Sequence, residues 1–275
     1  MSSVVSYLER AAEAGLAGEV CGLPYVADRY DDPFTGVHQV LVEYCAPGLV
    51  APHGRLGALL GSVMERHPLA GRVLLRVAGA GVLPAPWQRR TTYIEYGGGD
   101  RQPSAGAVTV RPARAADDPL VHRWLVCAFR NSYPGQVIDP QHAGITSLLS
   151  APGRRSFIAE VAGVPVGHGT VLLGESDEIT GEPFAELVDI LIDPPEHRRA
   201  ATGALVSAAA AAGGDLPLRG HVVHPRDGAG GARAGQVLGG LLHAGWHIAH
   251  GFWDRDLTAV PAAGGGAADG MRRQC

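Results

Sequence analysis

Two carboxylates on one apolar strand are the groups in this sequence best placed to accept a proton. The run from Phe184 to Asp193 has the apolar, β-branched composition of a buried strand, and it carries Glu186 and Asp189. A carboxylate is rarely buried unless it is paired or functional. Within hydrogen-bond reach, it can take the proton of an attacking amine or hydroxyl. The two residues are three positions apart, so a regular strand would point them to opposite faces.

The segment after this strand has the composition of an anion-binding turn. Pro194 and Pro195 end the strand, because proline gives a sheet no N–H group. An alanine-rich helix is predicted over Ala204–Ala212. Small residues where a helix begins let a ligand approach the free N–H groups, which together with the helix dipole favour an anion such as a pyrophosphate. Arg198 and Arg199 add full positive charge just upstream.

This stretch resembles motif A of the GNAT superfamily of N-acetyltransferases. That motif runs strand, then Arg/Gln-x-x-Gly-x-Gly/Ala, then helix. Here it reads Arg198-Arg199-Ala200-Ala201-Thr202-Gly203, followed by Ala204. Ala201 stands where the pattern has its first glycine. The pattern is short and degenerate, and the alternative interpretation is an ordinary crossover from strand to helix.

The order of predicted elements extends the resemblance to about residues 107–258. The order βααβββαβαβ resembles that of the GNAT fold, which implies an α+β class with a mixed, largely antiparallel sheet flanked by helices. The predicted elements are strand 108–113, helices 118–130 and 140–150, the hairpin 155–161 and 164–173, strand 184–193, helix 204–212, strand 218–223, helix 232–244 and one or two strands within 247–257.

Residues 1–98 are predicted to form a smaller α/β accessory domain. The expected elements are helix 3–14, an irregular segment 19–36, strand 37–45, helix 56–66 and strands 72–78 and 91–96. This order resembles a degenerate half of a GNAT domain. Residues 99–106 read as a glycine-rich linker, and residues 259–275 as a disordered tail.

The resemblance implies roles for particular residues. Pantetheine would pair with the backbone of Leu191, Ile192 and Asp193. The pyrophosphate would contact the N–H groups of Arg198, Arg199, Ala200, Ala201, Thr202, Gly203 and Ala204.

Glu186 sits where several members of the superfamily keep a general base, and Asp189 is a second candidate. A bulge, which is frequent in this strand of the superfamily, would change which faces the two carboxylates share. The general acid of the superfamily is usually a tyrosine, and the resemblance places Leu241 at its position. His224 is a substitute proton donor in this interpretation, and the alternative is a strand-end histidine exposed to water.

Composition excludes several other classes of function. The formal net charge of −4 gives no footprint for nucleic acid. The four cysteines are far apart, so neither a zinc site nor a disulfide framework is predicted, and the histidine spacings favour no metal. No signal peptide or membrane span is predicted, which indicates a cytoplasmic protein.

The sequence therefore predicts an acyltransferase that uses a phosphopantetheine thioester, either acyl-CoA or an acyl carrier protein, as donor. The acceptor would be an amine or hydroxyl of a small molecule, in specialised metabolite biosynthesis. That last inference rests on a lysine-free composition rich in alanine and glycine, which is typical of GC-rich genomes. An aminoacyl-tRNA-dependent transferase and a non-catalytic acyl-CoA-binding sensor are the alternatives. Whether the chain forms a homodimer is left open.

Overall fold

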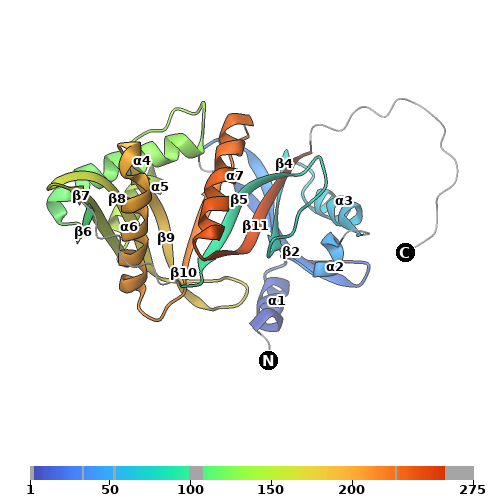
Figure 1. The fold of residues 1–275 in the computed structure, drawn as a ribbon. Coiled ribbons are helices and arrows are strands. Elements are labelled where there is room, and N and C mark those ends of the chain that lie inside the picture. Colours follow the sequence, from blue (N-terminus) through green and yellow to red (C-terminus); the bar gives the residue numbers. More distant parts are fainter. Residues whose placement is uncertain (1–2, 33, 52–53, 99–107, 227, 258–275) are drawn as a thin grey trace. The chain divides into compact units, whose positions relative to one another are not determined.

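The computed structural model describes residues 3–32, 34–51, 54–98, 108–226 and 228–257 (Figure 1). Contacts among the described residues divide the chain into two compact units. Unit 1 comprises residues 1–89 and 251–275, and unit 2 comprises residues 90–250. The expected linker, residues 99–106, and the expected tail, residues 259–275, lie outside the described residues.

Unit 1 is a small α/β unit built on β1–β4. Its elements are α1 (Ser3–Glu13), β1 (Ala17–Val20), β2 (Leu23–Asp31), β3 (His38–Cys45), α2 (Pro47–Val50), α3 (Leu56–Arg66) and β4 (Arg72–Ala78). β2 pairs antiparallel with both β1 and β3, and β3 pairs parallel with β4. The parallel pair requires a crossover connection, and α3 supplies it. Leu59, Leu60 and Val63 of α3 are buried in the core of the unit.

The prediction of an irregular segment over residues 19–36 was wrong. β1 and β2 occupy most of it, and the last four residues of β2, Asp28–Asp31, are exposed. Their polar side chains suggested a loop. Backbone pairing with β3, from Asp28↔Leu41 to Asp31↔His38, nevertheless holds them in a strand. Strand propensity is weak enough for such pairing to override it.

Unit 2 contains most of β5 and, up to residue 250, the elements expected over residues 107–258. They are β5 (Gln88–Tyr96), β6 (Val108–Pro112), α4 (Asp118–Ser132), α5 (Ala143–Ser150), β7 (Arg154–Val161), β8 (Val164–Ser176), β9 (Pro183–Ile192), α6 (Arg198–Gly213), β10 (Leu218–Val223), α7 (Gly228–His243) and β11 (Trp246–Asp256). Short 3₁₀ turns, Ala115–Asp117 and Pro195–His197, precede α4 and α6.

The sheet of unit 2 is mixed and largely antiparallel, as predicted. Its strand order runs β11-β5-β10-β9-β8-β7-β6. β10 and β9 pair in parallel, whereas β10 with β5, β9 with β8, β8 with β7 and β7 with β6 are antiparallel. The α+β class and the order βααβββαβαβ from β6 to β11 are confirmed.

Helices cover both faces of this sheet. α6 and α7 pack on one face, where Val206 and Leu238 share a core cluster with Val171 and Leu187 of the strands. On the other face, Trp124 of α4 stacks on His168 of β8. We call the first the α6 face and the second the α4 face. This layered arrangement buries both apolar sides of the sheet.

The two units divide the chain at positions that differ from the linker. Residues 90–98 were expected in the N-terminal domain, yet they belong to unit 2, because β5 pairs with β10 from Thr91↔Val223 to Glu95↔Arg219. Residues from Gly251 onward belong to unit 1, where Arg72 contacts Asp254 and Asp256 at 3.9 and 2.9 Å. Each unit thus contains a strand segment from beyond the linker.

Candidate functional site

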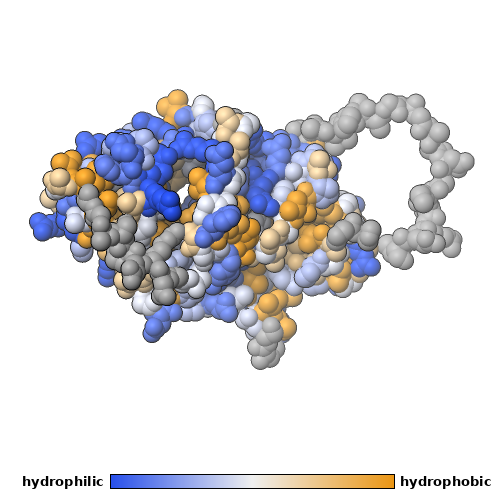
Figure 2. All heavy atoms as spheres, in the orientation of Figure 1, coloured by the Kyte–Doolittle hydropathy of each residue, from blue (hydrophilic) through white to orange (hydrophobic). Residues whose placement is uncertain are grey.

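β9 and β10 pair over a short stretch and then diverge. Their register runs from Leu218↔Ala185 to Gly220↔Leu187 and stops there. β9 continues to Ile192 with β8 on its other side, and β10 continues to Val223 with β5 on its other side. The residues of β9 beyond Leu187 therefore have a ladder partner on one side and face a gap on the other. Figure 2 shows a hollow between α6 and α7 that is bordered by both hydrophilic and hydrophobic residues.

The backbone of β9 presents hydrogen-bonding groups to this gap. The N–H group of Asp193 donates to the Val166 oxygen at 2.8 Å, so Asp193 belongs to the β8 side of the ladder. The backbone N–H and C=O groups of successive residues point to opposite edges of a strand. Those of Leu191 therefore point to β8, whereas those of Ile190 and Ile192 point to the gap. Of the predicted Leu191, Ile192 and Asp193, Ile192 is the residue whose backbone faces the gap.

A β-bulge brings Glu186 and Asp189 to the same face of the sheet. Glu186 lies opposite Leu172 of β8 and Asp189 lies opposite Thr170, so Val188 is the extra residue of β9. Thr170 and Leu172 are two residues apart on a strand that has no extra residue between them, and so they share a face. Both carboxylates therefore project on the α4 face, beside the point where β9 and β10 separate.

Asp189 is held by a buried histidine. Nε2 of His168 lies 3.1 Å from Oδ2 of Asp189, and the His168 side chain is fully buried. The ring stacks on Trp124 with centroids 5.2 Å apart and an interplanar angle of 5°. Thr170 Oγ1 lies 3.4 Å from its Nδ1 and 2.9 Å from Ser156 Oγ. These contacts fix Asp189 in one orientation.

Glu186 faces a cluster of rings on the neighbouring strands. Its Oε1 lies 3.7 Å from Nδ1 of His221 on β10. The ring of Tyr93 on β5 lies 5.5 Å from that of His221 and is stacked, at 4.5 Å and 13°, on His250 of β11. Sequence reasoning missed these rings as a group. Tyr93 precedes the linker, and the spacing of His221 from the other histidines favoured no metal.

The structure separates His224 from the two carboxylates. Nε2 of His224 lies 2.9 Å from Thr92 Oγ1, and both residues are buried. Thr92 is adjacent to Tyr93 on β5, so its side chain points to the α6 face. His221 thus lies on the face of Glu186 and Asp189, whereas His224 does not.

The helix that follows the motif begins earlier than predicted. α6 starts at Arg198, not Ala204. From Ala201 onward, each N–H group therefore bonds a carbonyl four residues earlier, and the Arg198 N–H group bonds Pro195 O. Ala201 is fully buried and packs with Leu205 and Ile192. Ala200, together with Ala201 at the position where the motif has its first glycine, favours a continuous helix over an open turn.

Within residues 198–204, helix geometry thus leaves the N–H groups of Arg199 and Ala200 for an anion. The side chains of Arg198 and Arg199 are exposed. Neither forms an ion pair with a described residue.

No set of three or more His, Cys, Asp or Glu side chains in the described part of the chain is arranged to hold a metal ion. Among the same residues, no helix is long and apolar enough to cross a membrane.

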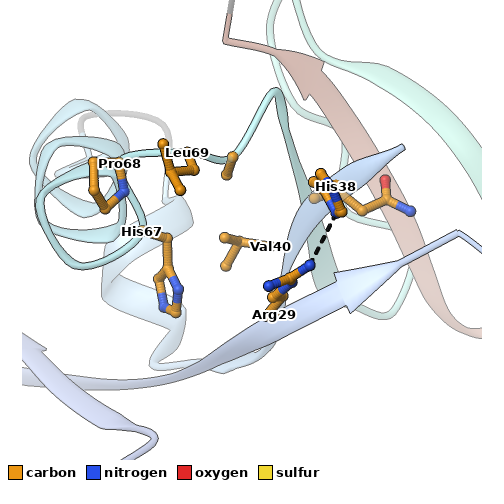
Figure 3. Close-up of a pocket in the computed structure, with 8 residues that line it drawn as sticks. Arg29, His38, Val40, His67, Pro68 and Leu69 are labelled. Carbon is orange, nitrogen blue, oxygen red and sulfur yellow. Dashed lines mark hydrogen bonds between the residues drawn. The ribbon is translucent and has the colours of Figure 1, made fainter. Parts of the chain in front are cut away.

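A separate hollow lies in unit 1 and has a different character. It encloses about 270 Å³ at the amino ends of β3 and β4 (Figure 3). The residues lining it are Arg29, His38, Gln39, Val40, His67, Pro68, Leu69 and Ala70. His38 and Arg29 both contact Asp31, at 2.6 and 3.0 Å, and their hydrogen bonds lower the pKa of that carboxyl. The lining contains no carboxylate, hydroxyl or thiol that could serve acyl transfer.

Comparisons with known proteins identify no family. No family model matches the sequence, and no curated protein matches it. A conserved protein of unknown function from Staphylococcus epidermidis is similar in structure, at 8% identity and a TM-score of 0.45, over 81% of this chain and 85% of that one. A Drosophila protein is similar at 15% identity and a TM-score of 0.43, over 93% of this chain and 88% of that one. An acetyltransferase from Thermus thermophilus is similar at 20% identity and a TM-score of 0.37, over 55% of this chain and 98% of that one. At these identities and TM-scores the similarities carry no functional argument.

Proposed function

We propose that this protein is a GNAT-type acyltransferase that moves an acyl group from a phosphopantetheine thioester to an amine or hydroxyl of a small molecule. One observation carries the proposal. β9 separates from β10 after Leu187↔Gly220, and Glu186 and Asp189 project on one face beside that gap. A thioester arm lying along β9 would pair with the groups of Ile190 and Ile192 and present its carbonyl near both carboxylates.

In this mechanism Glu186 accepts the proton of the attacking amine. An ammonium group cannot attack a thioester, so a base within reach, directly or through water, raises the rate. Asp189 is held by His168 at 3.1 Å, which leaves Glu186 as the carboxylate with the looser contact, 3.7 Å from His221. We assign Asp189 to orienting the acceptor.

The donor that α6 favours is an acyl carrier protein. A diphosphate is best held by several free N–H groups in an open turn. Here the helix already uses the N–H groups from Ala201 onward, and the Ala201 methyl group is fully buried. A carrier-bound arm has a single phosphodiester, which Arg198 and Arg199 can meet together with the acidic surface of the carrier.

Unit 1 has the β3-α3-β4 order that a degenerate GNAT half would retain. We propose this origin for it, with a structural role.

A non-catalytic sensor of acyl thioesters is the second candidate. Leu241, at the position implied for an acidic tyrosine, packs on the α6-face core and can donate no proton. Turnover separates the two functions, because a sensor binds a thioester without consuming it.

The test is an acyl-transfer assay with one acyl group presented on CoA and on a carrier protein. The acceptors are benzylamine, tyramine and spermidine, and mass spectrometry detects the amide. We expect amide formation, faster from the carrier than from CoA. Equal or faster turnover from CoA, with tight CoA binding in calorimetry, would remove the donor preference. Thioester binding with no amide from any pair would favour the sensor.

A further inference from the structure

Transfer to an amine needs an acid as well as a base. When the C–S bond breaks, the electron pair stays on sulfur, and an alkyl thiolate leaves more readily if it is protonated as it departs. Resting on the proposed function, we propose that His221 is this proton donor and that Glu186 recharges it. The assignment rests on where His221 lies, on its contact with Glu186 and on the groups around it.

His221 is the first residue of β10 beyond the last pair with β9. The β9–β10 register ends at Gly220, whereas β10 stays paired with β5 through His221↔Tyr93 and onward. The backbone of His221 is therefore fixed, while its position borders the gap. A thioester sulfur lying in that gap would be flanked by β9 on one side and by His221 on the other.

The Nδ1 atom of His221 is buried, and it forms no hydrogen bond with any described residue. Glu186 Oε1 is 3.7 Å away, which is beyond hydrogen-bond length but within ion-pair range. A small movement of either side chain closes this distance, so a proton can pass between them. His168, in contrast, is fully buried and already bonded to Asp189, and it lies on β8 away from the gap.

Several charged and titratable groups lie on the strands packed against His221. Glu186 is on β9, Tyr93 and Glu95 are on β5, and His247 and His250 are on β11. On β10 itself, Arg219 forms ion pairs with Glu95, Asp177 and Glu182 at 3.0, 3.3 and 3.7 Å. Glu186 is thus the carboxylate that closes an ion pair with a protonated His221.

The proton balance closes without another reactant. The amine nitrogen attacks the carbonyl carbon, a C–N bond forms, and the amine proton passes to the Glu186 carboxylate. The C–S bond then breaks, and Nδ1 of the His221 imidazolium gives its proton to the sulfur, which leaves Nδ1 without a proton. Transfer of the proton from Glu186 to Nδ1 of His221 restores both groups. The sum is thioester plus amine giving amide plus thiol.

The experiment varies the leaving group. The full chain and its His221→Gln, Glu186→Gln, Tyr93→Phe and His243→Gln variants are assayed with the three amines and two donors, an acyl-pantetheine thioester and the acyl thioester of 4-nitrothiophenol. The aryl thiolate leaves without protonation. His243, the exposed last residue of α7, is the matched control for loss of an imidazole. Circular dichroism checks that each variant is folded.

We expect His221→Gln to lower turnover of the pantetheine thioester by about 10²–10⁴-fold and to leave the aryl thioester near the parental rate. Glu186→Gln should slow both donors, because both need the amine deprotonated. An equal loss with both donors, no loss with either, or the donor-selective loss in Tyr93→Phe would overturn the assignment to His221. If the parent chain transfers from neither donor, the proposed function fails and the assignment falls with it. If the parent chain is active but His221→Gln loses turnover equally with both donors, the assignment to His221 fails and the proposed function stands.

Discussion

Glu186, Asp189 and His221 share the α4 face at the gap between β9 and β10. Glu186 and Asp189 could be found from the sequence because carboxylates are unusual on an apolar strand. Their common face could not, because it depends on the bulge at Val188, which is visible only in the pairing with β8. His221 was hidden for a related reason: its partners Glu186 and Tyr93 lie on two other strands, β9 and β5, and nothing in sequence spacing brings those strands together.

Glu186→Gln should retain the fold and thioester binding and lower turnover by about 10²–10⁴-fold if Glu186 is the sole base. The amide keeps the size of the side chain but cannot accept the amine proton. Steady-state rates measure the change, and Glu178→Gln, on the exposed loop between β8 and β9, is the matched control. An unchanged rate across the pH range would remove Glu186 from the mechanism.

Thr92→Val tests whether His224 is structural. The substitution keeps the shape of the side chain and removes the 2.9 Å hydrogen bond to a buried imidazole. We expect the free energy of unfolding to fall by about 1–3 kcal/mol, as measured by urea denaturation. Turnover should be retained at a temperature where the variant is folded. Loss of turnover without loss of stability would return His224 to the chemistry.

At the scale of elements, the turn that leads into α4 is held by an ionised carboxylate. Arg111 contacts both oxygens of Asp117 at 2.7 and 3.0 Å, and the N–H group of Arg114 donates to the same carboxylate at 2.7 Å. The Arg111 hydrogen bonds, and then that of Arg114, lower the pKa of Asp117 to about 2.

A carboxyl group with a depressed pKa contributes stability above its unfolded value, about 3.9, and loses that contribution as the pH falls through its folded value. We therefore expect the free energy of unfolding to fall between about pH 4 and pH 2, and to fall less in Asp117→Asn. Urea denaturation at several pH values measures both slopes. Parallel slopes for the two proteins would show that Asp117 does not supply this dependence.

Most elements could be predicted because hydrophobic periodicity and turn residues agree along much of the chain. The hairpin at Gly163, which has φ of +78°, and the strand 72–78 are examples. The start of α6 could not be predicted from the sequence, because the glycine pattern suggested an open turn where Ala200 and Ala201 continue a helix. β2 could not be predicted either, because its polar end is held in a strand by pairing with β3.

At the scale of the whole molecule, the linker does not separate independent halves. Unit 2 includes β5, which precedes the linker, and unit 1 includes the chain from Gly251 onward, with Trp253 in its core. Removing the residues before the linker therefore takes β5 from unit 2 and the core partners of Trp253 from unit 1.

A fragment starting at Ser104 should be less soluble and less stable than one starting at Gln88. The shorter fragment lacks β5, so it exposes the edge of β10 and loses Tyr93. The longer fragment keeps β5 paired with β10 and keeps Tyr93. Sedimentation and thermal denaturation compare the two. If the Ser104 fragment proved well behaved and fully active, β5 would be dispensable and the first half would be an independent appendage.

The central claim is that the gap between β9 and β10 receives a phosphopantetheine arm. Hydrogen–deuterium exchange, measured with and without a thioether analogue of acetyl-phosphopantetheine, tests it most directly. Among the described residues, no strand pairs with the N–H groups of Ile190 and Ile192 on the gap side, and these groups should exchange quickly in the free protein. The account predicts slowed exchange in peptides covering residues 188–193, with no change in α3 of unit 1. Unchanged exchange over 188–193 at a saturating concentration of the analogue would contradict it.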